Sequence, residues 1–266
     1  MRPWCPSATP DFRYRLRCRV HFFVRELLPA AAAKYLEGFK EHMLRDEKEV
    51  QELEARLGPV VGHVDPVLRN CPRVYASLVR RLVRVGMVRL SLKARICLGA
   101  FCVKKKGGKI RLILDCRPSN RVFRPPPGVE LLTGEGLGRI EWDSGSWARD
   151  YPEHAVPDEA SALWVANGDV QDYFHRLLLD DTSEIGEYLS YPPILARHLG
   201  ITCLDGREVA PDYWIYPLSR SLPMGWSWLL YFAQTVSRGN ATTLMLVAQF
   251  GDARSWSPAC FRCMFG

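Results

Sequence analysis

The sequence predicts an α+β fold, in which an antiparallel hairpin is packed by amphipathic helices. Residues 34–57 and 73–85 carry apolar side chains at helical spacing. An apolar run ends shortly before Gly107–Gly108, and an alternating run follows it, which predicts a β-hairpin. Of the 266 residues, 47% are hydrophobic and 24% are charged, which is typical of a globular protein and excludes a disordered one.

The two predicted helices differ in charge. In residues 34–57, which end at Gly58–Pro59, the apolar positions form one face, which indicates a packing helix or one that docks a protein partner. In residues 73–85 the outward positions are arginines, and Gly86 ends the helix. The expected inward residues are Leu36, Phe39, Met43, Val50, Leu53 and Leu57 in the first helix, and Val74, Leu78, Leu82 and Val85 in the second.

The predicted hairpin joins Ile96–Val103 to Ile110–Asp115, so several lysines lie at its tip. An extended, proline-rich connector, residues 124–128, follows. Further on we expect a strand at 162–170, a short helix at 171–178, a loop at 220–225 and a helix at 227–236. The expected regions are a helical extension (1–65), a basic region with the hairpin (66–160), a third region (161–242) and an irregular tail (243–266).

Positive charge is concentrated in one part of the chain. The formal net charge is +7, but residues 66–124 contain sixteen Lys and Arg and one acid, Asp115, which leaves the rest of the chain negative. Such a stretch suggests a surface for phosphate-rich partners. A solvated basic face explains it equally well. Binding to a membrane surface fits less well, because the basic residues do not share one face of a single helix.

Several classes of protein are excluded by the pattern. No apolar run approaches the roughly 18 residues of a membrane helix, and the N-terminus lacks the apolar core of a secretory signal. Nine scattered cysteines favour a reduced, intracellular compartment. Gly134–Gly138 lacks the context of a dinucleotide loop, and Cys260 with Cys263 is too few ligands for a zinc site.

Three segments, in this order, carry a specific resemblance. They are Val103–Asn120 (VKKKGGKIRLILDCRPSN), Gly168–His175 (GDVQDYFH) and Leu222–Trp228 (LPMGWSW), which continues to Gln234. Together they resemble the fingers hairpin, the first palm carboxylate motif and the Leu-Pro-x-Gly motif of a reverse transcriptase of retroelement type. The resemblance covers residues 75–234. It implies polymerase-like fingers at 66–160, a partial palm at 161–242, and metal-dependent nucleotidyl transfer from a deoxynucleoside triphosphate (dNTP) on an RNA/DNA primer–template.

By this resemblance, Asp169 is the first ligand of Mg²⁺ (or Mn²⁺) and the catalytic carboxylate, with the carbonyl of Val170 as a helper. A helix N-cap is the alternative role for Asp169. Phe174 resembles the steric gate that lies against the sugar, and a core phenylalanine is the alternative. Asp172 fits a surface or helix-start position better than a metal site.

The same resemblance assigns substrate contacts. Lys105 and Arg111 resemble the pair that grips the triphosphate, a task that suits a point charge and a guanidinium fork. An exposed hairpin with solvated cations is the alternative. Met224 resembles a nucleotide- or template-contacting residue, and Gly225 allows close approach of a base pair. An ordinary turn is the alternative for this loop, and core packing is the alternative for Trp226 and Trp228.

One part of the pattern is missing. The family's other metal-binding carboxylates lie in an aromatic-x-Asp-Asp motif, and the sequence offers only Asp252, in Phe250–Ala253, in its place. One carboxylate does not readily hold two Mg²⁺ ions. The sequence therefore predicts a truncated domain that is inactive alone. Two other hypotheses stay open: a non-catalytic nucleic-acid-binding remnant, and a protein that docks a partner through residues 34–57.

Overall fold

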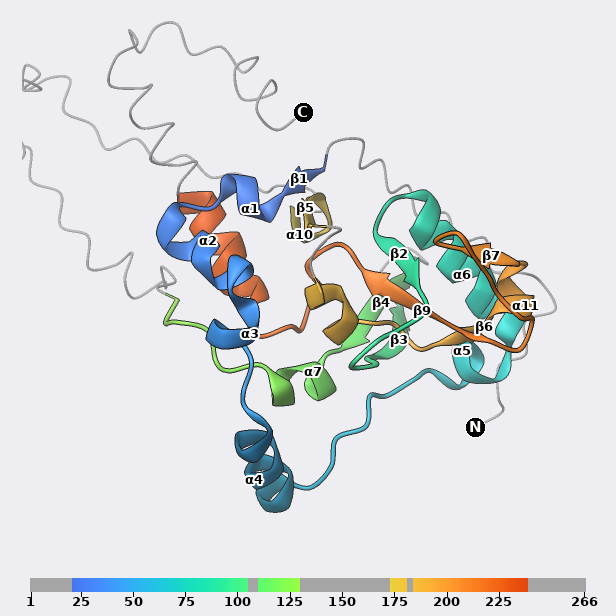
Figure 1. Ribbon diagram of the computed structural model, residues 1–266, viewed down its shortest axis with the longest axis horizontal. Coiled ribbons are helices and arrows are strands. Elements are labelled where there is room, and N and C mark those ends of the chain that lie inside the picture. Colours follow the sequence, from blue (N-terminus) through green and yellow to red (C-terminus); the bar gives the residue numbers. More distant parts are fainter. Residues whose placement is uncertain (1–20, 105–109, 130–172, 181–183, 239–266) are drawn as a thin grey trace, which may run out of the picture. The chain divides into compact units, whose positions relative to one another are not determined.

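The computed structural model describes residues 21–104, 110–129, 173–180 and 184–238. The chain divides into two compact units, one formed by Met1–Pro127 with Asp172–Gly266 and the other by Gly128–Gln171. Nearly all the described residues belong to the first unit. This unit mixes helices with small, mostly antiparallel sheets, which confirms the α+β class (Figure 1).

The first part of the unit is mostly helical. The strand β1 is Phe22–Phe23, and it is followed by six helices. These are α1 (Val24–Leu27), α2 (Ala30–Glu37), α3 (Phe39–His42), α4 (Glu47–Leu57), α5 (Pro66–Asn70) and α6 (Pro72–Arg84).

The next elements surround the hairpin and the loop that carries the Leu-Pro-x-Gly motif. They are β2 (Val88–Ser91), β3 (Gly99–Lys104), β4 (Ile110–Asp115), α7 (Arg117–Val122), α10 (Tyr173–Arg176), β5 (Leu177–Leu178) and the 3₁₀ helix Glu184–Tyr188. The last named elements are β6 (Ile194–Leu195), α11 (Ala196–Leu199), β7 (Cys203–Leu204), β8 (Arg207–Glu208) and β9 (Trp214–Ser219). A helix over 229–238 follows the loop.

The single helix predicted at 34–57 is wrong, because three helices, α2, α3 and α4, occupy this region. Gly38 separates the first two, and glycine weakens a helix interior. Asp46 starts α4 with a capping box, in which its side chain and that of Glu49 each accept a hydrogen bond from the other's backbone N–H. None of the α4 residues is buried, and Leu57 is 57% exposed, so the predicted continuous packing face does not exist.

Helix α6 lies within one residue of its predicted bounds at both ends and stops before Gly86, whose φ is +75°. Its fully buried face is rotated slightly from the prediction. The buried residues are Tyr75, Ala76, Val79 and Leu82, while Val74, Leu78 and Val85 are partly buried at the edge of the core.

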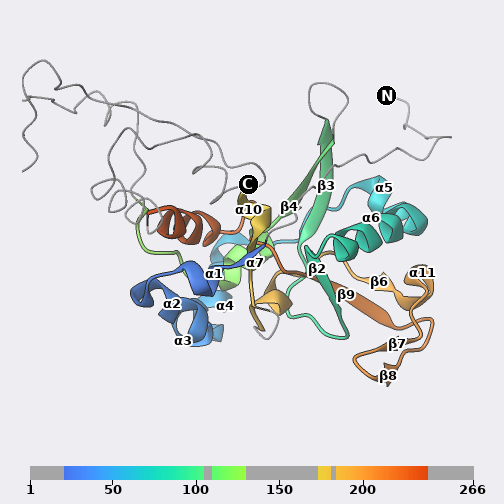
Figure 2. The same cartoon turned by 90° about the horizontal axis from the view of Figure 1, so that it is seen from above.

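The hairpin forms as predicted, although its first strand begins at Gly99 and not at Ile96. Strands β3 and β4 are antiparallel from Gly99 opposite Asp115 to Lys104 opposite Ile110, and they project from the helices around them (Figure 2). Backbone upstream of α5 lies along the hairpin, since Val64 bridges Ala100 and the Asp65 N–H donates to the Ala100 carbonyl at 2.9 Å. The hairpin is therefore anchored at its base by residues that precede it.

A second sheet leads to the Leu-Pro-x-Gly loop. Strand β9 lies between β2 and β6 and is antiparallel to both. After Ser219 the chain runs beside β5, where Leu178 bridges Ser221 and the Leu222 N–H donates to the Leu177 carbonyl. The predicted helix at 171–178 therefore gives way to a strand at its last two residues. The helix after the loop begins two residues later than predicted.

Candidate nucleic-acid interface

Arg111 lies on the exposed part of the hairpin. It pairs with Val103 across the ladder, one residue pair from the end of β4, and both side chains are exposed. Because side chains alternate along a strand, Arg111 shares a face with Ile113 and Phe101. Its exposure is compatible with both roles given for Arg111, the triphosphate contact and the solvated cation. Lys105, its predicted companion, lies outside the described residues.

Asp115, the acid of the basic stretch, is held at the base of the hairpin. Its carboxylate accepts hydrogen bonds from Nε and Nη2 of Arg117 at 2.8 and 2.6 Å, and from the His63 N–H at 2.8 Å. The Arg117 hydrogen bonds, with the His63 N–H, lower the pKa of Asp115 to about 2. The residue is 8% exposed, so Asp115 fixes the turn from β4 into α7 and is poorly placed to bind a ligand.

Helix α7 holds the Leu-Pro-x-Gly loop through one side chain. The Asn120 Nδ2 donates to the Gly225 carbonyl at 2.9 Å, and its Oδ1 accepts from the Ser227 N–H at 2.9 Å. The two hydrogen bonds join residues more than 100 positions apart. We call the residues they bring together, 114–120 and 222–227, the hairpin–loop junction.

Gly225 is required at this place by its backbone. Its φ is +106°, and a Cβ built on it would lie 3.2 Å from the Leu114 carbonyl at the end of β4. The loop therefore presses directly on the end of the hairpin strand. The neighbour at Gly225 in this structure is protein backbone, and the close approach of a base pair stays a prediction.

The loop turns one side chain outward and buries the others. Leu222 is fully buried and Pro223 is also buried, whereas Met224 is 40% exposed. Beneath the loop, burial raises the pKa of the Cys116 thiol to about 12, so this thiol is neutral at physiological pH. Met224 is thus the exposed apolar side chain of this loop, while its neighbour Gly225 packs against the end of β4.

Trp226 and Trp228 pack in the core, which confirms the structural alternative for both. Their exposed fractions are 2% and 1%. The Trp226 ring lies 5.3 Å from that of Phe123, edge to face, and the Trp228 Nε1 donates to the Arg124 carbonyl at 2.8 Å. These tryptophans fix the loop from below.

The segment after the predicted metal motif reaches the same part of the unit. Tyr173 donates from its hydroxyl to the Ala233 carbonyl at 2.9 Å, on the helix that follows the loop. Phe174 is partly buried, with its ring 5.7 Å from that of Tyr173. Parts of all three sequence motifs are therefore brought together within one unit, and both alternatives for Phe174 remain compatible with its position.

The predicted metal ligands Asp169, Val170 and Asp252 lie outside the described residues. Within the ranges that the structure describes, no three His, Cys, Asp or Glu side chains form a cluster that could hold a metal ion. The same ranges contain no helix with the length and apolar character to cross a bilayer.

Acids from other parts of the chain neutralise several of the basic residues. Glu187, itself buried, accepts from Lys93 at 2.7 Å and lies 3.7 Å from Arg95, and Arg124 pairs with Glu49 at 2.9 Å. The basic stretch is thus partly a set of internal ion pairs, which sequence composition alone does not distinguish from a binding surface.

The structure adds residues that the sequence prediction missed. The prediction includes Asn120 and Ser227 only as parts of their motifs, and it does not include strand β9. Pro217 lies inside β9 and pairs with Leu90, although proline disfavours a central strand. An apolar hollow of about 310 Å³ between α6 and β6, and a second hollow on α6, contain none of the predicted site residues.

Comparisons with known proteins give a structural likeness and no sequence match. No family model matches the chain, and no curated protein matches it. Among solved structures it is similar to the foamy viral protease–reverse transcriptase in complex with double-stranded DNA, with 14% identity and a TM-score of 0.35. The match covers 67% of this chain, which spans about a quarter (24%) of the viral one. Function is therefore inferred from the contacts within this chain.

Proposed function

We propose that this chain is a reverse-transcriptase-like domain that binds a nucleic-acid primer–template at the hairpin–loop junction. The observation that carries the proposal is the pair of hydrogen bonds from Asn120, which we call the Asn120 clamp. It joins the fingers-like hairpin motif to the Leu-Pro-x-Gly motif across 105 and 107 residues, at hydrogen-bond distance. Two motifs that resemble one family in sequence order are therefore also adjacent in space.

The junction and the adjoining hairpin together combine features that suit a nucleic acid. Phosphoryl transfer requires cations that position the phosphates and neutralise their charge. Arg111 provides an exposed guanidinium on the hairpin. Met224 provides an exposed apolar surface on the loop, next to Gly225, whose missing side chain lets the loop pack against the end of β4. Lys105 would add a second cation for the triphosphate of a dNTP.

We propose that this chain binds the primer–template but does not catalyse nucleotide incorporation by itself. By resemblance Asp169 would hold a Mg²⁺ or Mn²⁺ ion, with Val170 and Asp252 as further candidates. The sequence contains no aromatic-x-Asp-Asp motif to supply a second pair of carboxylates. One carboxylate would not readily hold the two ions that such a transfer would use, so the chemistry would need carboxylates that this sequence does not offer in that motif.

The test is binding and primer extension on one RNA template with a DNA primer. We expect salt-sensitive binding, measured by fluorescence anisotropy, that survives Asp169→Asn, and no incorporation in Mg²⁺ or Mn²⁺. Incorporation that Asp169→Asn abolishes would overturn the non-catalytic part of the proposal and assign polymerase activity. Absence of any binding by the folded chain would overturn the proposal as a whole.

A further inference from the structure

Helix α6 carries a cationic stripe on its exposed side. Arg73, Ser77, Arg80 and Arg84 follow one another at intervals of three or four residues, and all four are exposed. The opposite side of the helix is buried in the core. No acid occurs between Pro66 and Leu114, so the helix and its neighbours in sequence contribute no compensating negative charge. We call Arg73, Arg80 and Arg84 the arginine stripe.

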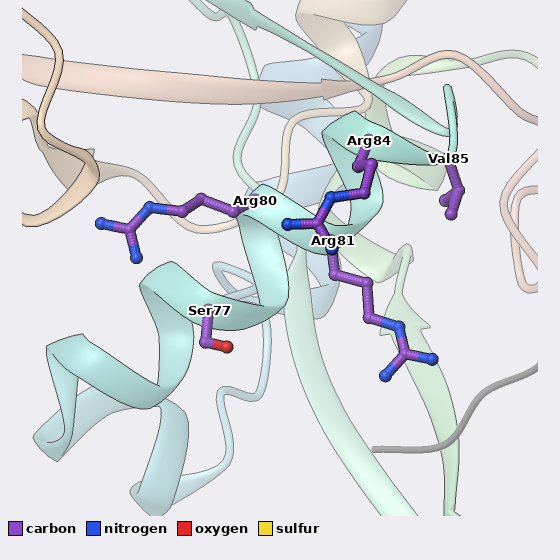
Figure 3. A pocket seen from close by; sticks show the side chains of 5 residues that line it. All are labelled: Ser77, Arg80, Arg81, Arg84 and Val85. Carbon is purple, nitrogen blue, oxygen red and sulfur yellow. The ribbon is translucent and has the colours of Figure 1, made fainter. Parts of the chain in front are cut away.

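Next to the arginine stripe, the surface of α6 is hollowed. The hollow has a volume of about 560 Å³ and is lined by Ser77, Arg80, Arg81, Arg84 and Val85. Arg80 and Arg81 extend to opposite sides of the helix, and Arg84 turns back along it toward the same turn (Figure 3). Three arginines therefore line one hollow with their guanidinium groups spread apart, which gives the hollow a cationic border suited to an extended anion.

The charges of the stripe differ from those at the hairpin base. Arg117, Lys93 and Arg95 pair with buried acids, whereas among the described residues neither Arg80 nor Arg84 forms an ion pair with an acid. The Arg80 Nη2 donates to the His198 carbonyl at 2.7 Å, which orients this guanidinium and leaves its charge uncompensated. Within the described part of the chain, no ion pair with a buried acid neutralises Arg80 or Arg84.

We propose that the arginine stripe binds the phosphate backbone of a nucleic acid, as a contact separate from the hairpin–loop junction. The inference rests on the proposed function, which supplies the reason to prefer a nucleic acid to an acidic peptide. Along the axis of α6, Arg80 and Arg84 are about 6 Å apart, and Arg73 and Arg80 are about 10 Å apart. Each guanidinium can form a bidentate contact with a phosphate and release counterions from it.

The experiment compares the salt dependence of binding for matched variants. Arg80→Gln with Arg84→Gln removes two stripe charges, and Arg56→Gln with Arg207→Gln removes two exposed charges on α4 and β8. The probes are a labelled primer–template and a labelled polyglutamate. Each lost phosphate contact reduces the slope of log K against log salt by about 0.7–0.9. We expect the stripe variant to lose about 1.4–1.8 in slope, and tenfold to a hundredfold in affinity at about 0.1 M salt.

The outcomes separate this inference from the proposed function. Loss of slope in the stripe variant and little change in the control support it. If wild type and the stripe variant bind primer–template with the same slope of log K against log salt, the proposal for the stripe is wrong and the proposed function stands. Wild-type protein that binds no nucleic acid overturns both proposals. Loss of polyglutamate binding with unchanged nucleic-acid binding assigns the stripe to an acidic peptide instead.

A folding defect is controlled by two further variants. Arg80→Lys with Arg84→Lys preserves the charge, and we expect it to restore most of the slope. Arg84→Gln alone leaves the Arg80–His198 hydrogen bond intact, and we expect a slope reduction of about 0.7–0.9. An unchanged slope in folded Arg84→Gln contradicts the inference even if the double variant does not fold.

Discussion

At the hairpin–loop junction, side chains are fixed by hydrogen bonds to backbone more than 100 residues away, whereas the arginine stripe presents charges along one exposed helix face. The junction depends on close packing, since a side chain at Gly225 would meet the Leu114 carbonyl at the end of β4. It depends also on the hydrogen bond from Asn120 to the Gly225 carbonyl. The stripe depends on the absence of nearby acids in the sequence. The first region is therefore expected to respond to small changes in structure, and the second to salt and net charge.

Apart from the control variants, the largest expected effect is at Gly225. Gly225→Ala introduces a side chain at φ +106° and 3.2 Å from the Leu114 carbonyl, and we expect a loss of about 2–4 kcal/mol in the free energy of unfolding. Gly206→Ala is the matched control, because Gly206 also has a positive φ (+73°) but has no neighbour within 4 Å of the added Cβ. It is expected to cost about 1–2 kcal/mol.

Denaturant unfolding of both variants measures the difference, which isolates the contact with β4 from backbone strain. Equal losses would show that the loop does not press on the strand.

The next effect is the acid dependence of stability at Asp115. Its pKa is lowered from 3.8 to about 2 in the folded protein, so its contribution is complete above about pH 4 and is lost as the pH falls toward 2. We expect the loss to be about 1–2 kcal/mol, because the Arg117 side chain is 67% exposed and its interaction is screened. Unfolding measured between about pH 5 and 2 tests this.

Asp115→Asn should be less stable at neutral pH and should have a flatter pH dependence, since asparagine does not titrate. A wild-type acid dependence that Asp115→Asn leaves unchanged would assign it to other carboxylates. The arginine stripe, which has no group that titrates in this range, should contribute no part of this dependence.

Removal of the Asn120 clamp should have an intermediate effect. Asn120→Ala loses both hydrogen bonds, and we expect about 1–2 kcal/mol of destabilisation together with a several-fold loss of primer–template affinity. Because no charge changes, the salt slope should stay the same, in contrast to the stripe variants. Asn120→Asp keeps the acceptor for the Ser227 N–H but places a carboxylate oxygen against the Gly225 carbonyl, so it should be no more stable than Asn120→Ala. A changed salt slope in Asn120→Ala would mean that the two regions are coupled.

Local pattern predicted the parts of the fold that depend on neighbouring residues. The alternation after Gly107–Gly108 predicted the correct pairing of β3 with β4, and the arginines of α6 were correctly expected outside. The helix at 34–57 was wrong because apolar spacing outweighed Gly38 and the cap formed by Asp46 and Glu49. Strand β9 was missed because Pro217 obscured it.

The junction itself was beyond local pattern. Its motifs were recognised, but nothing in the spacing of Asn120 and Gly225 indicates that they meet, since the hydrogen bonds depend on how β4, α7 and β9 pack. The ion pairs of Glu187 are a second case, because composition counted Lys93 and Arg95 toward a binding surface.

The smallest expected effect on stability is at Met224, and its comparison with Leu222 distinguishes a binding residue from a packing residue within the loop. Met224 is 40% exposed, so Met224→Ala should change the free energy of unfolding by less than about 0.5 kcal/mol. Its buried neighbour Leu222 is the control, and Leu222→Ala should cost about 2–5 kcal/mol. If Met224 contacts the nucleic acid, Met224→Ala lowers primer–template affinity several-fold without a change in salt slope, because the lost contact is apolar. Affinity equal to wild type in a fully folded Met224→Ala would remove the loop from the interface and leave Arg111 and the arginine stripe as its described contacts.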